Sequence, residues 1–255
     1  MRRPVLLLTT MALAVLAAGG VAQAIINGQP DGNRHPYVGL VTDDEFVCSG
    51  AAISPKAFIT AAHCFDKPGQ EVSVTFDPDG FYGEEDSVFY TGTWYPDPEF
   101  CIGCAGGLVG FDTHDVAVVI LDEPVRLSRY ARLPSEGLVD RLANKTRATA
   151  VGYGIQDRLK DLDEGELFTR YYAPVELIQS NGRISDEFLK VTANPSQGKG
   201  GTCFGDSGGP ILKGDTILGV NSFVTNGNCA GVTYAYRIDT SEALEFINSV
   251  IRRYA

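Results

Sequence analysis

Three residues of this chain have side chains that could act together in catalysis. His63, one of only three histidines among 255 residues, lies in a run of small residues beside Cys64. Asp115 directly precedes the apolar run at 116–121, a poor place for an unpaired carboxylate. Ser207 lies between glycines, a composition that predicts a tight turn exposing its hydroxyl and the neighbouring N–H groups. Taken alone, His63 is typical of a packed core histidine and Asp115 of a turn or capping residue.

Taken together, the three residues predict acyl-transfer chemistry. A serine hydroxyl is a weak nucleophile until a base accepts its proton, and a carboxylate must hold that base in the correct tautomer. The sequence therefore predicts Ser207 as the nucleophile, His63 as the general base and Asp115 as the residue that orients the base.

The segments around these residues resemble the trypsin/chymotrypsin-type serine proteases. The matching segments are Thr60-Ala-Ala-His-Cys64, Asp115-Val-Ala-Val-Val and Gly205-Asp-Ser-Gly-Gly-Pro210, with weaker matches at Ile25-Ile-Asn-Gly28, Cys48-Ser-Gly50, Gly152-Tyr-Gly154 and Ser222-Phe223. They follow the order of the family and span nearly all of the chain after residue 24. The resemblance implies an all-β fold of two packed six-stranded antiparallel β-barrels, with the active site in the cleft between them and a C-terminal α-helix.

The same resemblance implies a secreted serine endopeptidase that hydrolyses peptide bonds through an acyl-enzyme. Ser207 would attack the carbonyl, His63 would transfer the proton, and the N–H groups of Gly205 and Ser207 would form the oxyanion hole. The alternative is a protease-fold binding protein that is catalytically silent. Such proteins usually lack a triad residue or the activating N-terminus, and this chain keeps both.

Composition and periodicity agree with a mostly β fold that ends in one helix. Glycine makes up 29 of the 255 residues, which favours many turns. Alternation at 71–76 and apolar runs at 116–121, 148–153 and 216–223 predict strands. An apolar stripe predicts a helix at 240–253, capped by Asp239 or Thr240. We expect an N-terminal barrel at 25–133, carrying His63 and Asp115, and a C-terminal barrel with the helix at 134–255, carrying Ser207.

Residues 1–24 predict a signal peptide. Arg2 and Arg3 precede an apolar stretch, and Ala22-Gln-Ala24 is a typical cleavage signal. A membrane anchor is the alternative, but the apolar run is near the lower limit for spanning and no basic stop-transfer cluster follows. Cleavage after Ala24 predicts an extracellular chain with no stable membrane association. By the resemblance, the new Ile25 ammonium would then pair with Asp206; a short propeptide removed by a second protease is the alternative.

The six cysteines predict disulfides, because an exported chain meets an oxidising environment. Their spacing alone allows 15 connectivities. The resemblance implies the pairs Cys48–Cys64 and Cys203–Cys229, which leaves Cys101 and Cys104 for each other. A zinc site at this last C-x-x-C pair is the alternative, but the chain has no second pair of that spacing.

The resemblance also indicates the substrate pocket. Its candidates are Gly201, Thr202, Asn221, Ser222, Phe223 and Val224. Gly201 stands where trypsin-type enzymes carry the aspartate that receives Arg or Lys, and a buried arginine without a carboxylate would be costly. Val224 stands where open-pocket relatives have glycine, so its side chain should narrow the entrance. We expect cleavage after small or medium uncharged residues, as in elastase- or chymotrypsin-like enzymes.

The charge of the chain limits its partners. The formal net charge is −11, and no basic face for a nucleic acid is evident. We expect a monomer that binds polypeptide substrates and protein inhibitors and needs no cofactor or catalytic metal. The acidic segment Asp77–Asp86 falls where some relatives carry a calcium loop, with a solvated acidic turn as the alternative.

Overall fold

The structure is a computed structural model of the 255-residue chain. It describes residues 25, 27–80, 87–104, 113–154, 168–178, 187–194, 199–224 and 229–255. The predicted signal peptide at 1–24 lies outside these residues. Among the helices of the described ranges, none is long and apolar enough to cross a membrane.

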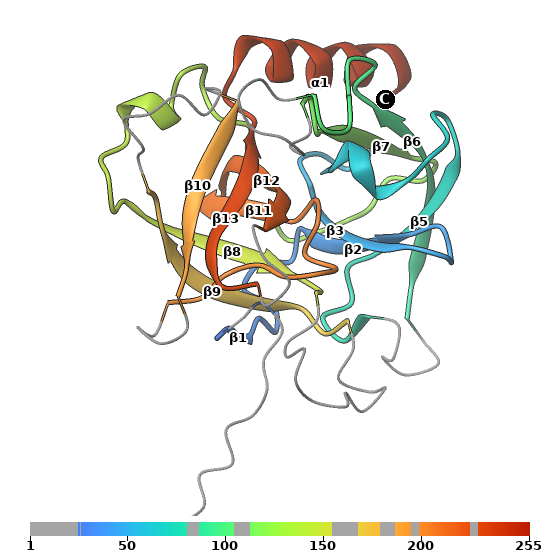
Figure 1. The fold of residues 1–255 in the computed structure, drawn as a ribbon. Coiled ribbons are helices and arrows are strands. Elements are labelled where there is room, and N and C mark those ends of the chain that lie inside the picture. Colours follow the sequence, from blue (N-terminus) through green and yellow to red (C-terminus); the bar gives the residue numbers. More distant parts are fainter. Residues whose placement is uncertain are drawn as a thin grey trace, which may run out of the picture.

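Six antiparallel strands of the first half close into a barrel (Figure 1). In sheet order they are β2 (Val38–Thr42), β3 (Val47–Ala52), β4 (Ala57–Thr60), β7 (Ala117–Leu121), β6 (Phe89–Pro96) and β5 (Glu71–Thr75). The predicted alternation is confirmed in β5, where Val72 and Val74 are buried. All five residues of β7 are buried, as its continuous apolar run predicts. The first of the two predicted barrels is therefore confirmed.

The second half forms a curved sheet of seven strands, not a closed barrel of six. In order they are β1 (Gln29–Pro30), β9 (Tyr171–Glu176), β8 (Arg147–Gly152), β11 (Pro210–Lys213), β12 (Thr216–Val224), β13 (Gly231–Arg237) and β10 (Phe188–Ala193). The extra strand β1 pairs with the free edge of β9. A single bridge, Leu177 to Val191, joins the end of β9 to β10, so the described part of this sheet curls without a full closing ladder.

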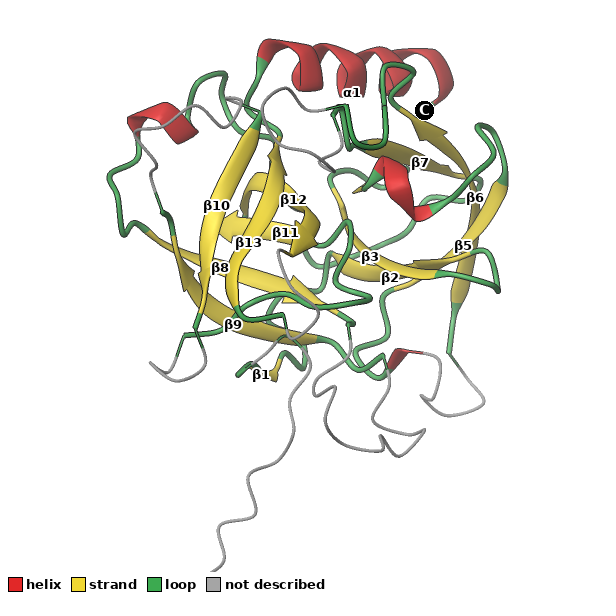
Figure 2. Ribbon diagram, viewed as in Figure 1, coloured by secondary structure: helices red, strands yellow, loops and turns green. Residues whose placement is uncertain are grey.

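The helix α1 (Ser241–Tyr254) begins and ends one residue later than predicted. Thr240 caps it by accepting a hydrogen bond from Ala243 N at 3.2 Å. The helix lies across the top of the molecule and packs on β7 of the first barrel (Figure 2). Near its end, the rings of Tyr254 and Tyr95 stack at 4.3 Å. The C-terminal segment therefore returns to the first barrel and holds the two halves together.

A buried arginine clamps the N-terminal segment and both halves together. Arg170, just before β9, has no exposed surface. Its Nη1 donates to the carbonyl oxygens of Val38 at 2.7 Å and Phe76 at 3.0 Å, both in the first half. Its Nη2 donates to Gly32 O at 2.6 Å, and its Nε pairs with Asp31 at 3.0 Å. Since nearly every guanidinium donor is used, this charge is buried without an unsatisfied group.

We expect Arg170→Met to destabilise the fold by about 3–5 kcal/mol. The variant takes the guanidinium from the buried Asp31 carboxylate, which keeps His35, and leaves the carbonyl oxygens of Val38, Phe76 and Gly32 without this donor. The measurement is the free energy of unfolding in urea. Arg126→Met is the matched control at an exposed arginine, where surface changes typically cost less than about 0.5 kcal/mol. Equal small losses in the two variants would contradict the clamp.

Candidate active site

The structure fixes His63 to Asp115 by two hydrogen bonds. His63 lies in the short helix η1 (Ala62–Cys64), directly after β4, and Asp115 lies just before β7. The backbone N–H of His63 donates to Asp115 Oδ1 at 3.0 Å. His63 Nδ1 lies 2.7 Å from Asp115 Oδ2. An ionised carboxylate can only accept, so Nδ1 carries the proton and Nε2 of the neutral ring is left as the acceptor.

Asp115 is fully buried but stays ionised because of its partners. Burial alone would raise its pKa, but the charge and hydrogen bonds of His63 and the hydroxyl of Ser222 together hold the pKa below its usual value. Ser222, predicted as a pocket residue, donates its hydroxyl to Asp115 Oδ2. It lies at a bulge in β12, between Asn221 and Phe223 in the ladder with β13. We did not predict this contact, since it joins residues 107 apart in sequence.

The Ser207 turn lies against the segment that carries His63. Ser207 O accepts a hydrogen bond from Ser49 N of β3 at 2.8 Å. A Cβ at Gly208, whose φ is +75°, would lie 2.2 Å from Thr60 Oγ1 and 2.7 Å from Ala61 N. Only glycine therefore allows this turn to approach residues 60 and 61, immediately before η1. The second half thus supplies Ser207 at its junction with the first barrel.

Two N–H groups beside Ser207 are available to a ligand. Asp206, Gly208 and Gly209 all donate to backbone oxygens. Within the described ranges, no acceptor is found for the N–H of Gly205 or of Ser207. Gly205 has a φ of +90°, which favours glycine, and its carbonyl accepts from Ser49 Oγ at 2.8 Å. The predicted oxyanion-hole donors are therefore held in place with their hydrogens unused.

The pocket candidates surround the same turn. Gly201 packs so tightly that a Cβ there would lie 2.3 Å from Ala193 Cβ. The hydroxyl of Thr202 bonds to the hydroxyl of Thr233 at 3.0 Å, and Asn221 Nδ2 donates to Asp206 O at 3.1 Å. Two polar candidates are therefore engaged within the chain, while Asn221 Oδ1 is buried without a donor in the described part.

The last two pocket candidates end β12. The ring of Phe223 stacks on Tyr234 at 4.7 Å, so this side chain is fixed by its neighbour across the sheet. Val224, partly exposed, pairs with Thr233 in the β12–β13 ladder.

Asp206 and Ile25 both lie near β8. Asp206 is fully buried, and burial raises its pKa to about 7 although the N–H groups of Cys203 and Gly154 donate to it. Ile25 is buried against Ala150 of β8 and its neighbours in the sheet. Its nitrogen is a peptide N–H in the 255-residue chain, and no ion pair reaches Asp206 among the described residues.

The three predicted disulfide pairs are present in the structure: Cys48–Cys64, Cys101–Cys104 and Cys203–Cys229. The first joins β3 to η1 beside His63, and the third joins the loop before Ser207 to the segment before β13. Among the described residues, the one group with metal-ligand spacing is Cys48, His63 and Cys64. Because its two sulfurs form a disulfide, this group does not offer thiolates to zinc.

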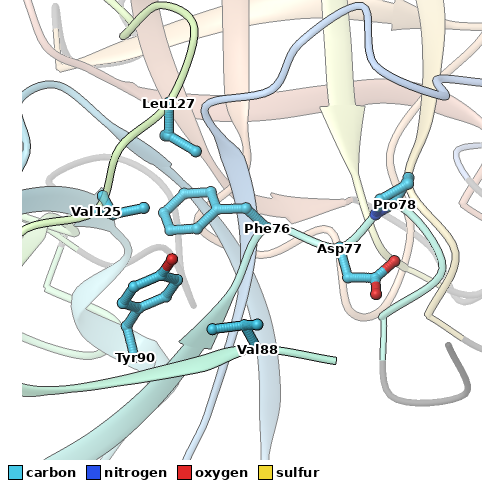
Figure 3. Close-up of a pocket in the computed structure, with 7 residues that line it drawn as sticks. All are labelled: Phe76, Asp77, Pro78, Val88, Tyr90, Val125 and Leu127. Carbon is cyan, nitrogen blue, oxygen red and sulfur yellow. The ribbon is translucent and has the colours of Figure 1, made fainter. Parts of the chain in front are cut away.

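The acidic segment is described only at its beginning, residues 77–80. Residues 81–86 lie outside the described residues, so the calcium prediction stays untested. Asp77 already accepts from Asp79 N at 2.9 Å and from the Ser87 hydroxyl at 3.0 Å. A cavity of about 310 Å³ lies beside it (Figure 3). Its apolar side chains gather around the ring of Phe76 while the Asp77 carboxylate points away, so its walls do not suit a cation.

Comparisons with known proteins give one consistent result. A family model described as Trypsin matches residues 25–247. Granzyme M of Rattus norvegicus is 29% identical over 244 residues, covering 89% of each chain. Brachyurin of Leptuca pugilator is 29% identical over 225 residues, covering 83% of this chain and 88% of its own.

Two solved structures have the same fold. Human heparin binding protein has a TM-score of 0.67 and 19% identity, covering 91% of this chain and 98% of its own. A structure titled HL collagenase has a TM-score of 0.66 and 23% identity, covering 89% and 99%.

The raised pKa of Asp206 predicts a pH-dependent stability of the 255-residue chain. The pKa of about 7 means that the folded carboxyl keeps its proton to about pH 7, but the unfolded one loses it near its ordinary pKa of 3.8. Between these pH values the folded state binds more protons, so this group lowers the free energy of unfolding as pH rises. We expect Asp206→Asn to gain about 3–4 kcal/mol relative to wild type from pH 4 to pH 7.

The measurement is urea unfolding at each pH. The side-chain amide of the variant has one acceptor oxygen, so its NH2 group faces one of the two backbone N–H donors. This lowers the free energy of unfolding by the same amount at every pH and does not change how that energy varies with pH. Asp79→Asn, at an exposed carboxylate, is the control and should run parallel to wild type. A parallel curve for Asp206→Asn as well would show that Asp206 is not protonated.

Proposed function

This chain belongs to the trypsin family of serine proteases, and from that premise we propose that it is a secreted endopeptidase with Ser207, His63 and Asp115 as its triad. The observation that carries the proposal is the pair of hydrogen bonds from His63 to the buried Asp115. That pairing directs the basic Nε2 away from Asp115. The Ser207 turn is packed against the segment that leads into His63.

The proposed reaction assigns a role to each of these side chains and to two backbone N–H groups. Ser207 Oγ attacks the substrate carbonyl as His63 Nε2 takes its proton, and Asp115 stabilises the resulting imidazolium. The unused N–H groups of Gly205 and Ser207 donate to the oxyanion; such donors contribute about 3–4 kcal/mol each. His63 then protonates the leaving amine, and water hydrolyses the acyl-enzyme by the reverse steps.

We propose that cleavage before Ile25 completes the site. The side chain of Ile25 is already buried beside β8, and Gly154, just beyond that strand, donates to Asp206. A new ammonium at Ile25 would give the Asp206 carboxylate an opposite charge, which lowers a pKa that burial now raises. Signal-peptide removal after Ala24 would create this ammonium directly, and the three disulfides suit an extracellular enzyme.

The proposed specificity is for small or medium uncharged residues before the cleaved bond. The tight packing of Gly201 against Ala193 leaves no carboxylate at that wall to receive Arg or Lys. The hydroxyl of Thr202 is used by Thr233, so it adds little polarity to the pocket. Val224 at the end of β12 narrows the entrance.

A silent binding protein is the competing function. One structure of the same fold is titled a heparin binding protein. Heparin is a polyanion, and the net charge of −11 on this chain opposes the binding of polyanions. The pairing of His63 with Asp115 and the unused donors at Gly205 and Ser207 favour the enzyme.

We expect a fluorophosphonate probe to label the secreted protein at one site per chain, because only an activated serine attacks it. Intact mass should place the N-terminus at Ile25. The control is Ser207→Ala, which should abolish labelling. Labelling only after further trimming would refute direct maturation. No labelling of a chain that starts at Ile25 would refute the triad and favour the binding protein.

We expect Val224→Gly to widen the pocket. In a peptide library, the wild type should prefer Leu, Val, Ala or Thr before the cleaved bond, and the variant should gain about 10-fold or more in kcat/KM for Phe or Trp relative to Ala. Val232→Ala, in β13 but outside the predicted pocket, is the control and should keep the wild-type order. Unchanged selectivity in Val224→Gly would show that Val224 does not line the substrate pocket.

A further inference from the structure

A second pocket lies beside η1, on the first barrel. Its volume is about 340 Å³, and Ala62, the residue before His63, forms part of its wall. The other walls come from the segment after η1, from the end of β6 and from the loop that follows β6. None of its lining residues is among the predicted pocket residues Gly201, Thr202 and 221–224. It is therefore a separate feature within one residue of the proposed general base.

The chemistry of its walls combines aromatic rings with carboxylates. Phe65, Trp94 and Phe100 supply three rings, and Asp66 and Asp97 supply two carboxyl groups. Among the described residues that line it, there is no lysine, arginine or histidine. Aromatic faces and carboxylates both attract cations, and the aliphatic stem of a basic side chain packs well on such rings.

The carboxyl groups have no cationic partner within the described part of the chain. Asp97 is almost fully buried, and its Oδ1 accepts a hydrogen bond from Glu99 N at 2.9 Å. No ion pair of the described residues involves Asp66 or Asp97. Burial raises the pKa of Asp97, although the N–H of Glu99 and the charge of His114 act to lower it. Lys67, next to Asp66, is exposed and does not line the pocket.

The pocket wall also holds an unused hydrogen-bond donor. Trp94 is 1% exposed, and its indole N–H is buried without an acceptor in the described residues. Phe65 packs edge-on against this indole at 5.6 Å and fixes its ring. This N–H is enclosed by protein, so the groups that the pocket presents to a ligand are its rings and its carboxyl groups. A basic side chain supplies the cation that both kinds of group attract.

We propose that this pocket, lined by Phe65, Asp66, Trp94, Asp97 and Phe100 beside His63, binds a lysine or arginine side chain of the polypeptide substrate. The inference rests on the proposed function, since it assigns a second recognition element to the same active site. The uncharged residue before the cleaved bond would enter the pocket near Ser207. The basic residue, elsewhere in the substrate, would enter the pocket beside His63.

The test is a lysine walk along a cleavable peptide. Quenched fluorescent peptides share one uncharged residue before the cleaved bond and carry a single lysine at each other position in turn. Matched peptides carry norleucine, which keeps the methylene stem and lacks the ammonium. We expect lysine at one position to raise kcat/KM about 5–10-fold over norleucine, and added salt to reduce the ratio, since Asp66 is exposed.

Variants of the pocket and of a distant acid separate local binding from net charge. Asp66→Asn and Asp97→Asn should each bring the lysine-to-norleucine ratio close to one. Asp44→Asn is the control: Asp44 is exposed, does not line the pocket, and has a φ of +74° that asparagine tolerates. It should keep the wild-type ratio. Because Asp66 is on the surface, the test does not depend on the folding of Asp97→Asn.

The outcomes distinguish this inference from the proposed function. Suppose that fluorophosphonate labels Ser207 and norleucine peptides are cleaved, but lysine has no effect at any position. The proposal that this pocket binds a basic side chain is then wrong, and the proposed endopeptidase function is supported. An equal loss of the ratio in all three variants would show a general charge effect, which also overturns the pocket. If neither labelling nor cleavage occurs, the proposed function itself has failed.

Discussion

The site depends on one hydrogen bond across the junction of the two halves, from Ser49 N to Ser207 O at 2.8 Å. Ser49 lies in β3 of the first barrel, one residue from the disulfide that anchors η1. Its hydroxyl also donates to Gly205 O and accepts from Tyr153 N. One residue of the first barrel therefore holds the turn that carries the proposed nucleophile through its backbone N–H, and the residue that begins the proposed oxyanion hole through its hydroxyl. Preorganisation of this kind keeps reacting groups aligned without reorganisation during the reaction.

Two fully buried aspartates beside this junction show how partners, more than burial, decide charge. Asp115 accepts hydrogen bonds from His63 and Ser222, and its pKa lies below the usual value. Asp206 accepts hydrogen bonds from the backbone N–H groups of Cys203 and Gly154, and burial raises its pKa to about 7. Backbone amides solvate a carboxylate but bring no countercharge. In the 255-residue chain, Asp115 therefore already has the partners that keep it ionised. Asp206 is a buried acid that still lacks a cation.

The sequence was most informative where function depends on local backbone geometry. The glycines around Ser207 predict the tight turn because few other residues adopt a φ of +75° or +90°. Period-two patterns likewise predict β5. The contacts of Ser49, Ser222 and Arg170 could not be predicted, because each joins segments about a hundred residues apart and follows from how the halves pack. The open second sheet was missed for the same reason: β1 pairs with β9 across the fold.

The two proposed substrate pockets are built from different halves of the chain, which affects how substrate selectivity can arise. The predicted pocket near Ser207 is built from the loop before that residue and from β12 of the second half. The described walls of the pocket beside His63 all come from the first half of the chain. Because the described walls of the two pockets share no residue, a substitution in one pocket leaves the wall residues of the other unchanged. Under the two proposals, the second half would select an uncharged residue of the substrate and the first barrel a basic one.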